Sequence, residues 1–226
     1  MERYARNIGT LTPEENELLR TKRAAIVGCG GLGGYILEML GRLGVGHLTV
    51  IDGDVFAPSN LNRQLLSDTG NIGGSKVLAA AERMKLVNPD IAVTPVAAVL
   101  DEDNALALLR NHDVVMDALD NIPSRLAIAR ACAALQIPLV HGAIHAWYGQ
   151  VATILPGDDT MERIYQSPEF QKNLRPSNPS FTPALVAALQ VAEAVKLLTG
   201  RGTLLSGGTL LLADTLHNEY RLTKLK

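Results

Sequence analysis

Apolar runs and helical patterns alternate along the first two thirds of the chain. Five runs have the length and composition of buried strands: 24–28, 47–52, 91–96, 113–117 and 139–142. Five segments have helical spacing or helix-start signals: 13–20, 31–43, 74–87, 101–109 and 124–135. Strands that alternate with helices in this way are typical of a doubly wound parallel sheet. We therefore expect an α/β, Rossmann-like fold.

The pattern changes after the fifth strand. We expect a strand at 149–155, then a polar crossover loop with little periodicity at 157–182. An apolar helix at 183–198 and a hairpin of two strands, 209–214 and 219–224, should follow. These strands break the strand–helix rhythm, so we expect a sheet that is parallel in its first half and mixed or antiparallel in its C-terminal half. We expect one domain over 1–226, with an N-terminal arm and helix in 1–22.

Composition narrows the function classes. Apolar residues make up 47% of 226 residues and aromatic residues only 4%, which predicts a sizeable aliphatic core. The net charge of -2 gives no electrostatic case for binding nucleic acid or an anionic membrane. The N-terminus lacks a signal-peptide pattern, and no uninterrupted apolar run reaches the roughly 18 residues of a membrane span. We expect a cytoplasmic protein with neither membrane nor nucleic-acid partners.

The first apolar run leads directly into a glycine loop. Gly28, Gly30 and Gly33 form the spacing Gly-x-Gly-x-x-Gly between a predicted strand and a predicted helix. Glycines there let phosphates approach backbone N–H groups at the start of a helix. Asp52 lies at the end of the second strand, about 20 residues further on, where an acceptor for ribose hydroxyls belongs. The pattern predicts a nucleotide site; the alternative is a tight turn selected only for packing.

Two cations and an amide follow this unit. Arg63, Gln64 and Lys76 lie downstream of the second strand, where a dinucleotide site needs no further positive charge. A triphosphate does need it, and arginine supplies a fork of donors whereas lysine supplies a point charge. Each cation alone would be an ordinary surface group. Their combination with the glycine loop favours ATP over NAD.

Asp120 follows the fourth strand at the same edge of the predicted sheet. Magnesium is usually held by one or two carboxylates together with phosphate oxygens, so Asp120 is a candidate Mg²⁺ ligand. The alternative is a helix N-cap for the segment that begins near Pro123.

The motifs, taken in order, resemble those of the MoeB/ThiF/HesA family, the bacterial relatives of ubiquitin-activating enzymes. The resemblance covers nearly the whole chain and rests on these elements: Arg3-Tyr4-x-Arg6, Gly28-Cys29-Gly30-Gly31-Leu32-Gly33, Asp52-x-Asp54, Ser59-Asn60-Leu61-x-Arg63-Gln64, Gly74-x-Lys76, Asp117-x-x-Asp120-Asn121 and Gly149-Gln150-Val151.

The resemblance implies a homodimer that uses ATP and Mg²⁺ to adenylate the C-terminal glycine of a small ubiquitin-like sulfur-carrier protein. It implies cofactor-binding roles for Gly28, Gly30, Gly31, Asp52, Asp54, Asn60, Arg63, Gln64 and Lys76. It also implies catalytic roles for four residues: Arg63, Lys76, Asp120 and Arg6. Asp120 would bind Mg²⁺, and Arg6 would reach into the partner subunit's site.

The implied reaction is attack of a carboxylate oxygen on the α-phosphorus, with pyrophosphate leaving. We expect no general base, because a C-terminal carboxylate is already ionised at neutral pH. His141 and His145 are therefore interpreted as packing or channel residues rather than catalytic ones. The carrier would end in Gly-Gly, because a narrow channel over the sheet edge would exclude larger side chains.

The chain departs from the family in its cysteines. Many members carry two Cys-x-x-Cys pairs that bind zinc, but this chain has only Cys29 and Cys132, so we expect no such zinc site. The predicted crossover loop also lacks the cysteine that some members use to bond the carrier covalently. We expect adenylation without a covalent enzyme intermediate, with the adenylate passed to a separate sulfur donor.

Three other functions stay open at this point. An enzyme of the same fold could act on a tRNA-modified nucleoside or on a peptide. An NAD-dependent oxidoreductase is weakened by Arg63 and Lys76 and by the lack of a recognisable hydride-transfer motif. A non-catalytic scaffold that binds a ubiquitin-like tail is weakened by the retention of every phosphate-facing residue.

Overall fold

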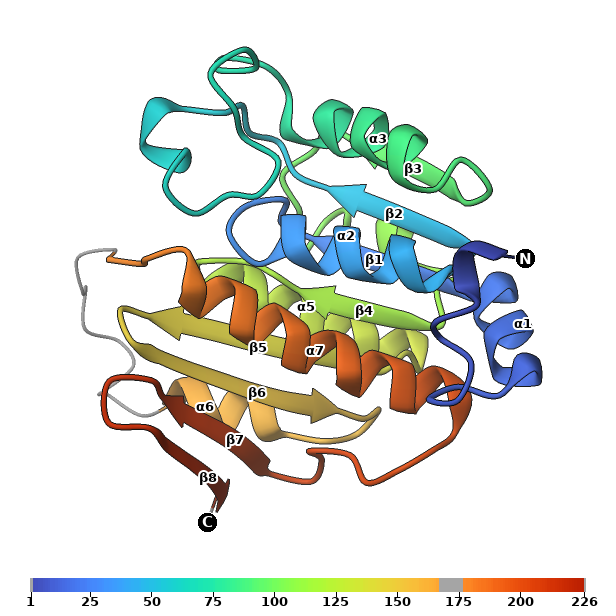
Figure 1. The fold of residues 1–226 in the computed structure, drawn as a ribbon. Coiled ribbons are helices and arrows are strands. Elements are labelled where there is room, and N and C mark those ends of the chain that lie inside the picture. The colour runs from blue at the N-terminus through green and yellow to red at the C-terminus, as the bar shows by residue number, and fades with distance from the viewer. Residues whose placement is uncertain (1, 167–176, 226) are drawn as a thin grey trace.

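The computed structural model describes residues 2–166 and 177–225, which fold around one eight-stranded sheet. The strand order is β3-β2-β1-β4-β5-β6-β7-β8. The strands are β1 (Arg23–Val27), β2 (His47–Ile51), β3 (Ala92–Val96), β4 (Val114–Asp117), β5 (Leu139–His145), β6 (Tyr148–Ile154), β7 (Thr209–Asp214) and β8 (Glu219–Lys224). Strands β1 to β5 are parallel, and β6, β7 and β8 are antiparallel to their neighbours. The predicted change from a parallel to an antiparallel half is confirmed (Figure 1).

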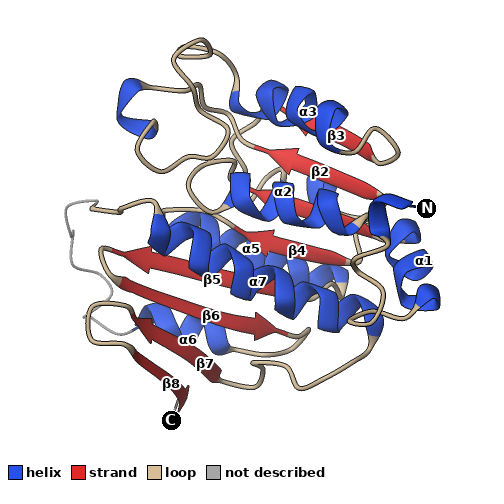
Figure 2. Ribbon diagram, in the orientation of Figure 1, coloured by secondary structure: helices blue, strands red, loops and turns tan. Residues whose placement is uncertain are grey.

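Helices cover both faces of the sheet (Figure 2). They are α1 (Pro13–Thr21), α2 (Gly33–Leu43), α3 (Lys76–Val87), α4 (Ala105–Leu109), α5 (Ile122–Leu135), α6 (Thr160–Gln166) and α7 (Phe181–Thr199), with short 3₁₀ turns η1 (Glu2–Tyr4) and η2 (Pro58–Asn60). One apolar core joins the sheet to α1, α2, α3 and α7. A second core joins the opposite face to α4, α5 and α6. The sheet is therefore the middle of three layers.

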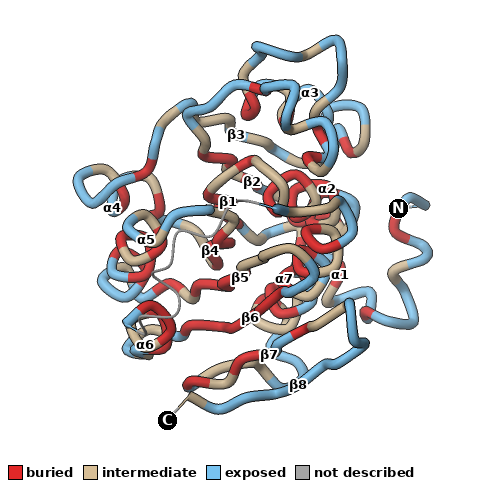
Figure 3. The backbone as a smooth tube through the Cα atoms, turned by 90° about the vertical axis from the view of Figure 1, so that its left-hand side faces the viewer, coloured by how far each residue is buried: buried red, intermediate tan, exposed pale blue. Residues whose placement is uncertain are grey.

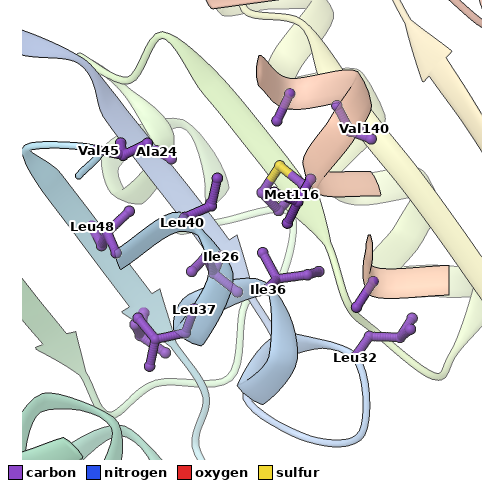
Figure 4. Packing of buried hydrophobic residues seen from close by; sticks show 14 of the residues in the cluster. Ala24, Ile26, Leu32, Ile36, Leu37, Leu40, Val45, Leu48, Met116 and Val140 are labelled. Atoms are coloured by element: carbon purple, nitrogen blue, oxygen red, sulfur yellow. The ribbon is translucent and has the colours of Figure 1, made fainter. Parts of the chain in front are cut away.

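The buried strands explain why the apolar runs predict the sheet well. Residues 24–27 of β1 are all buried because helices lie on both faces of this central strand. Ile36, Leu37 and Leu40 place one stripe of α2 against the same face as Ile26 (Figure 4). The edge strand β8 is exposed along its whole length, whereas the central strands are buried (Figure 3). The second strand of the predicted C-terminal hairpin is thus the least buried strand of the sheet.

The fifth strand extends beyond its predicted end at Gly142. Strand β5 continues to His145 and turns through Ala146 and Trp147 into β6. Gly142 does not stop the strand, because its lack of a side chain serves packing: a Cβ there would lie 2.3 Å from Cδ of Gln190 on α7. The predicted end of the fifth strand at residue 142 was therefore too early.

A helix, α6, lies within the segment predicted to be a polar loop. Met161, Ile164 and Tyr165 are buried on one side of it, a single turn of apolar spacing that is too short to stand out in the sequence. The Asp158 carboxylate accepts the backbone N–H of Thr160 at 2.8 Å and so caps the first turn. Residues 167–176 of the predicted crossover loop lie outside the described part.

Three helices begin later than the apolar spacing predicts. Helix α2 begins at Gly33 rather than near residue 31, and α3 begins at Lys76 rather than near residue 74. The sequence pattern predicts a helix that begins at Asp101, but α4 begins only at Ala105. The Asp101 carboxylate instead accepts two backbone N–H groups of the preceding turn. An aspartate side chain bonds backbone N–H groups both in turns and at the start of helices, so the sequence alone does not show which of the two follows Asp101.

Helix α7 is the one helix of the described chain that is long and apolar enough to cross a membrane. The core helix of a soluble protein passes the same test, so this is weak support for a membrane role. In this fold Val186, Ala187 and Val191 pack into the core beneath the sheet. Glu193 on the same helix is buried and accepts the Thr153 hydroxyl at 2.7 Å. The apolar composition of α7 is accounted for by this packing.

Candidate functional site

The carboxyl ends of β1, β2 and β4 border a cavity of about 480 Å³. This edge of the sheet lies on the left of Figure 1, where the arrowheads of these strands point. Open α/β sheets bind their ligands at this edge. Eight predicted site residues line the cavity: Gly28, Gly30, Gly31, Asp52, Asp54, Arg63, Gln64 and Asp120. Three others do not line it: Arg6, Asn60 and Lys76.

The glycines of the loop serve two different purposes. Gly28 has a φ of +93°, and an added Cβ would lie 2.6 Å from the Ala118 carbonyl oxygen. A Cβ on Gly33 would lie 1.9 Å from the Gly28 carbonyl oxygen, so both positions require glycine for the fold itself. A Cβ on Gly31 would meet nothing closer than 3.6 Å, and one on Gly30 nothing closer than 3.4 Å. At these two positions the protein leaves space in the cavity wall that a ligand can approach.

The Asp52 carboxylate organises the glycine loop. Its Oδ2 accepts the backbone N–H of Cys29 at 2.7 Å, and its Oδ1 accepts the backbone N–H of Asp54 at 2.8 Å. The side chain is only 11% exposed. Each carboxylate oxygen can accept more than one hydrogen bond, so Asp52 can hold the loop and still face a ribose. The predicted ribose acceptor is thus also part of the loop's framework.

Lys76 lies behind the cavity wall rather than in it. Its side chain is 8% exposed, and its Nζ donates to Asp54 Oδ2 at 2.9 Å. Asp52 Oδ2 is 3.9 Å from the same nitrogen. The Asp54 carboxylate is 71% exposed and faces the cavity. The carboxylate that holds the Lys76 ammonium group therefore lines the cavity, whereas Lys76 itself does not.

The turn after η2 holds Arg63 and Gln64 at the cavity. Asn60 was predicted to contact phosphates, but it bonds within this turn instead. Its side-chain oxygen accepts the Ala57 N–H. Its backbone carbonyl oxygen accepts the backbone N–H groups of Arg63 and Gln64. Arg63 donates to the Ser59 carbonyl oxygen at 2.8 Å. Gln64 is buried, and no hydrogen-bond partner for its Oε1 exists among the residues described. A buried acceptor of this kind favours a ligand that carries a donor.

Asp120 stands at the rim of the cavity and is exposed. It is not the N-cap of α5, because the Asn121 side chain accepts the Ser124 N–H at 2.9 Å and fills that position. Within the described ranges no hydrogen bond or ion pair involves its carboxylate. A lone carboxylate beside a glycine loop fits the way proteins hold Mg²⁺, with one or two carboxylates, phosphate oxygens of a substrate and several waters.

Arg6 lies far from the cavity of its own chain. The N-terminal segment packs at the opposite end of the sheet, where Tyr4 contacts Gly44 and accepts a hydrogen bond from Asn88 at 2.8 Å. Figure 1 shows the N-terminus on the side away from the strand carboxyl ends. The structure therefore does not bring Arg6 to the other site residues.

Arg125 is a site residue that the sequence analysis missed. It is buried, yet it borders the cavity and donates to the Tyr165 hydroxyl oxygen and the Leu119 carbonyl oxygen, both at 2.5 Å. Its Nε lies 3.6 Å from the buried carboxylate of Asp117. The charge neutralises Asp117 and anchors the loop that carries Asp120. In the sequence, Arg125 is simply an arginine in the first turn of a predicted helix, and nothing distinguishes it from an ordinary surface arginine.

His141 belongs to the same buried group. Its Nδ1 lies 2.6 Å from Asp117 Oδ2, and its Nε2 lies 3.1 Å from Gln150 Nε2. Burial lowers the pKa of His141, although the Asp117 hydrogen bond opposes this effect. A neutral ring protonated on Nδ1 donates to Asp117 and accepts from Gln150. His141 is completely buried, so its geometry agrees with the packing role expected of it.

A second cavity of about 770 Å³ continues from the first along β6, β7 and β8. The two cavities share Asp120, Asn121, Arg125, Ile144 and His145. His145 therefore lies at the junction, which agrees with its interpretation as a channel residue.

The described residues contain no group of three or more His, Cys, Asp or Glu side chains that could hold a metal by themselves. A metal at Asp120 therefore depends on oxygen ligands from another molecule. Both cysteines are buried and unpaired, and burial raises the pKa of each thiol to about 12. Neither is placed as a nucleophile.

Similar proteins agree with this geometry. The sulfur carrier protein adenylyltransferase of Thermus thermophilus is 38% identical, over 98% of this chain and 86% of the relative. The molybdopterin-synthase adenylyltransferase of Escherichia coli is 36% identical, over 92% of this chain and 85% of the relative. The SAMP-activating enzyme E1 of Haloferax volcanii is 36% identical, over 93% and 80% respectively. These relatives confirm the prediction of an adenylyltransferase.

Solved structures share the fold. Escherichia coli MccB with ATP superposes with a TM-score of 0.87 at 20% identity, covering 100% of this chain and 72% of that one. PaaA superposes with a TM-score of 0.83 at 21% identity, covering 99% and 73%. Residues 4–226 match the ThiF family. The fold, the glycine-loop cavity and these relatives together show that the chain belongs to the ThiF family, as its motifs predicted.

Proposed function

We propose that this protein uses ATP and Mg²⁺ to adenylate the C-terminal glycine carboxylate of a small ubiquitin-like sulfur-carrier protein. The observation that carries the proposal is the junction of the two cavities at Asp120. One cavity is built on the nucleotide-type glycine loop, and the other offers space for an extended chain. Their meeting point is where a carboxylate and an α-phosphate would have to meet.

The relatives favour a carrier protein as the substrate. Those that are 36 to 38% identical are named for activating a sulfur carrier, SAMP or molybdopterin synthase. The structures of MccB and PaaA are only 18 to 21% identical and support the fold alone. A peptide or tRNA substrate is therefore the less supported alternative, and NAD chemistry lacks support from any of these proteins.

The reaction needs positioning and charge more than covalent chemistry. The carrier carboxylate is already ionised and attacks the α-phosphorus; the bond to the bridging oxygen breaks, and pyrophosphate leaves with the electron pair. Arg63 and Lys76 would balance the charge of the phosphates. The open backbone at Gly30 and Gly31 lets those phosphates approach.

Asp120 would hold the Mg²⁺ ion. When bound, the metal would supply a positive charge that offsets the negative charge on the leaving group. Arg125 keeps the Asp120 loop in place through the Leu119 carbonyl oxygen. Arg125 thus holds the backbone next to Asp120 in place, while the Asp120 carboxylate stays exposed and able to bind a metal.

No covalent step on a cysteine is part of the proposal. Cys29 and Cys132 are buried, and their raised pKa values keep both thiols protonated. The acyl-adenylate would pass directly to a sulfur donor. In the homodimer that we propose, Arg6 would approach the partner's cavity, since it cannot reach its own.

ATP–pyrophosphate exchange tests the proposal. The protein is incubated with labelled pyrophosphate, ATP, Mg²⁺ and a panel of carriers that end in Gly-Gly. We expect exchange with one carrier only, and its loss in Lys76→Ala. ATP binding without exchange for any carrier would contradict the proposal and favour a tRNA or peptide substrate. A non-catalytic scaffold would bind a carrier equally well with and without Lys76.

A further inference from the structure

Lys76 and Asp54 are fixed opposite one another by the backbone. The Lys76 N–H donates to the Asp54 carbonyl oxygen at 3.2 Å, and Val55 and Ser75 form an antiparallel bridge beside them. The side-chain ion pair of 2.9 Å therefore joins two segments that already lie side by side. The ammonium group returns to the same carboxylate whenever nothing else binds it.

The two members of the pair are exposed very differently. The Lys76 side chain is 8% exposed and Asp54 is 71% exposed, so the carboxylate lies between the ammonium group and the cavity. Asp52 also faces Lys76, but at 3.9 Å and with both oxygens bonded to backbone N–H groups. Asp54 has no such backbone bonds to its carboxylate in the described structure, which leaves it free to give up the lysine.

We propose that Asp54 is a positioning residue that acts as an internal competitor of phosphate for Lys76. It neutralises the ammonium group in the empty site, yields it to the phosphates of ATP, and takes it back when pyrophosphate leaves. Asp54 thus weakens the binding of both polyanions and aids release of the product. The inference rests on the proposed ATP site, and it gives Asp54 a role other than direct contact with the nucleotide.

Electrostatic repulsion and the existing ion pair oppose phosphate binding at Lys76. A phosphate that binds Lys76 must break the existing ion pair and then lies near the displaced carboxylate, a like charge. Removing the carboxylate charge removes both costs. Ion pairs with one exposed member are worth modest free energies, so the effect on a dissociation constant is a several-fold change.

The test measures binding of inorganic pyrophosphate and of ATP, each with Mg²⁺, by calorimetry. Asp54→Asn is expected to lower both dissociation constants about fivefold and to strengthen product inhibition of carrier adenylation by pyrophosphate by the same factor. Asp54→Ala serves as a second variant, and Asp68→Asn, an exposed aspartate whose Oδ1 accepts the Gly70 N–H, is the matched control. Unchanged or weaker binding in both Asp54 variants would overturn the inference.

A double-mutant cycle with Lys76→Met separates competition from a general charge effect. If Asp54 acts through Lys76, then Asp54→Asn changes pyrophosphate binding in the wild-type background and not in Lys76→Met. An equal gain in both backgrounds would overturn the inference. Failure of the wild-type protein to bind ATP would refute the proposed function instead, so the two failures are distinguishable.

Discussion

Asp52 Oδ2 accepts the backbone N–H of Cys29 at 2.7 Å, which ties the end of β2 to the glycine loop after β1. The same carboxylate accepts the Asp54 N–H through its other oxygen. One side chain thus fixes both the loop and the segment that carries the Asp54 carboxylate. The acid expected to hold a ribose is therefore needed before any nucleotide arrives.

Asp52→Ala should reduce both stability and nucleotide binding. The loss of two charge-assisted hydrogen bonds is expected to lower the free energy of unfolding by about 2 kcal/mol. ATP binding is expected to weaken about tenfold or more, because the loop and the ribose acceptor are lost together. Denaturant unfolding and calorimetry measure the two effects. Weaker ATP binding at unchanged stability would show that Asp52 acts on the ligand alone.

Gly31→Ala and Gly33→Ala form a matched pair. The added methyl group at Gly31 has room, so stability should change by less than about 0.5 kcal/mol. At Gly33 it would clash with the Gly28 carbonyl oxygen, and a loss of about 3 kcal/mol or failure to fold is expected. If phosphates lie against Gly31, its variant loses ATP affinity while it melts like the wild type. A Gly31→Ala protein with unchanged ATP affinity would contradict the placement of the nucleotide.

The sequence predicts the parts of this molecule that depend on local chemistry. The β1 run and the stripe on α2 predict their elements because residues 24–27 of β1 and Ile36, Leu37 and Leu40 of α2 are buried. Helix α6 escapes detection because one buried turn carries too little periodicity. Gly142 misleads because glycine marks strand ends and close packing alike. In each case the deciding contact comes from a distant segment.

The candidate site divides in the same way. Spacing places Gly28, Asp52 and Asp120 at one sheet edge, because parallel strands end there together. Spacing cannot show that Lys76 is held by Asp54, or that Asn60 builds a turn instead of facing the cavity. Arg125 is found only when the folded chain brings it beside Asp117. Contacts between residues that lie far apart in the sequence cannot be predicted from spacing along the chain.

Asp120→Asn should separate nucleotide binding from catalysis. The carboxylate is exposed, so stability is expected to stay within about 0.5 kcal/mol of the wild type. The variant should still bind ATP but should lose exchange activity and require more Mg²⁺, because an amide is a poorer ligand than a carboxylate. The matched control is Asp103→Asn, an exposed aspartate outside the cavity. Wild-type dependence on Mg²⁺ in Asp120→Asn would refute its assignment as the metal ligand.

Stability should fall as the pH decreases below about 6.5, the ordinary pKa of histidine. Burial lowers the pKa of both His141 and His112, so the unfolded chain binds protons that the folded chain excludes. Each group stabilises the fold fully above its unfolded pKa and loses this contribution as the pH falls, by up to about 1.4 kcal/mol per pH unit. Denaturant unfolding between pH 5 and 8 measures the slope.

Substitution identifies the histidine responsible. His141→Gln can still donate to Asp117, and it should remove its share of the pH dependence, as His112→Gln should remove the other. Exposed His217 serves as the control, because its hydrogen bond to Asp214 raises its pKa. Its contribution to stability is therefore present at low pH and is lost as the pH rises. A His141→Gln protein with the full wild-type slope would show that His141 is protonated in the folded state.

The most direct test of adenylation is the intact mass of the carrier after incubation with the protein, ATP and Mg²⁺. We expect the carrier to gain one AMP at its C-terminal carboxylate, with no covalent adduct on the enzyme. The gain should disappear when the terminal glycine of the carrier is changed to valine. A protein that consumes ATP while no Gly-Gly carrier acquires AMP would contradict the proposal that it activates a ubiquitin-like sulfur carrier.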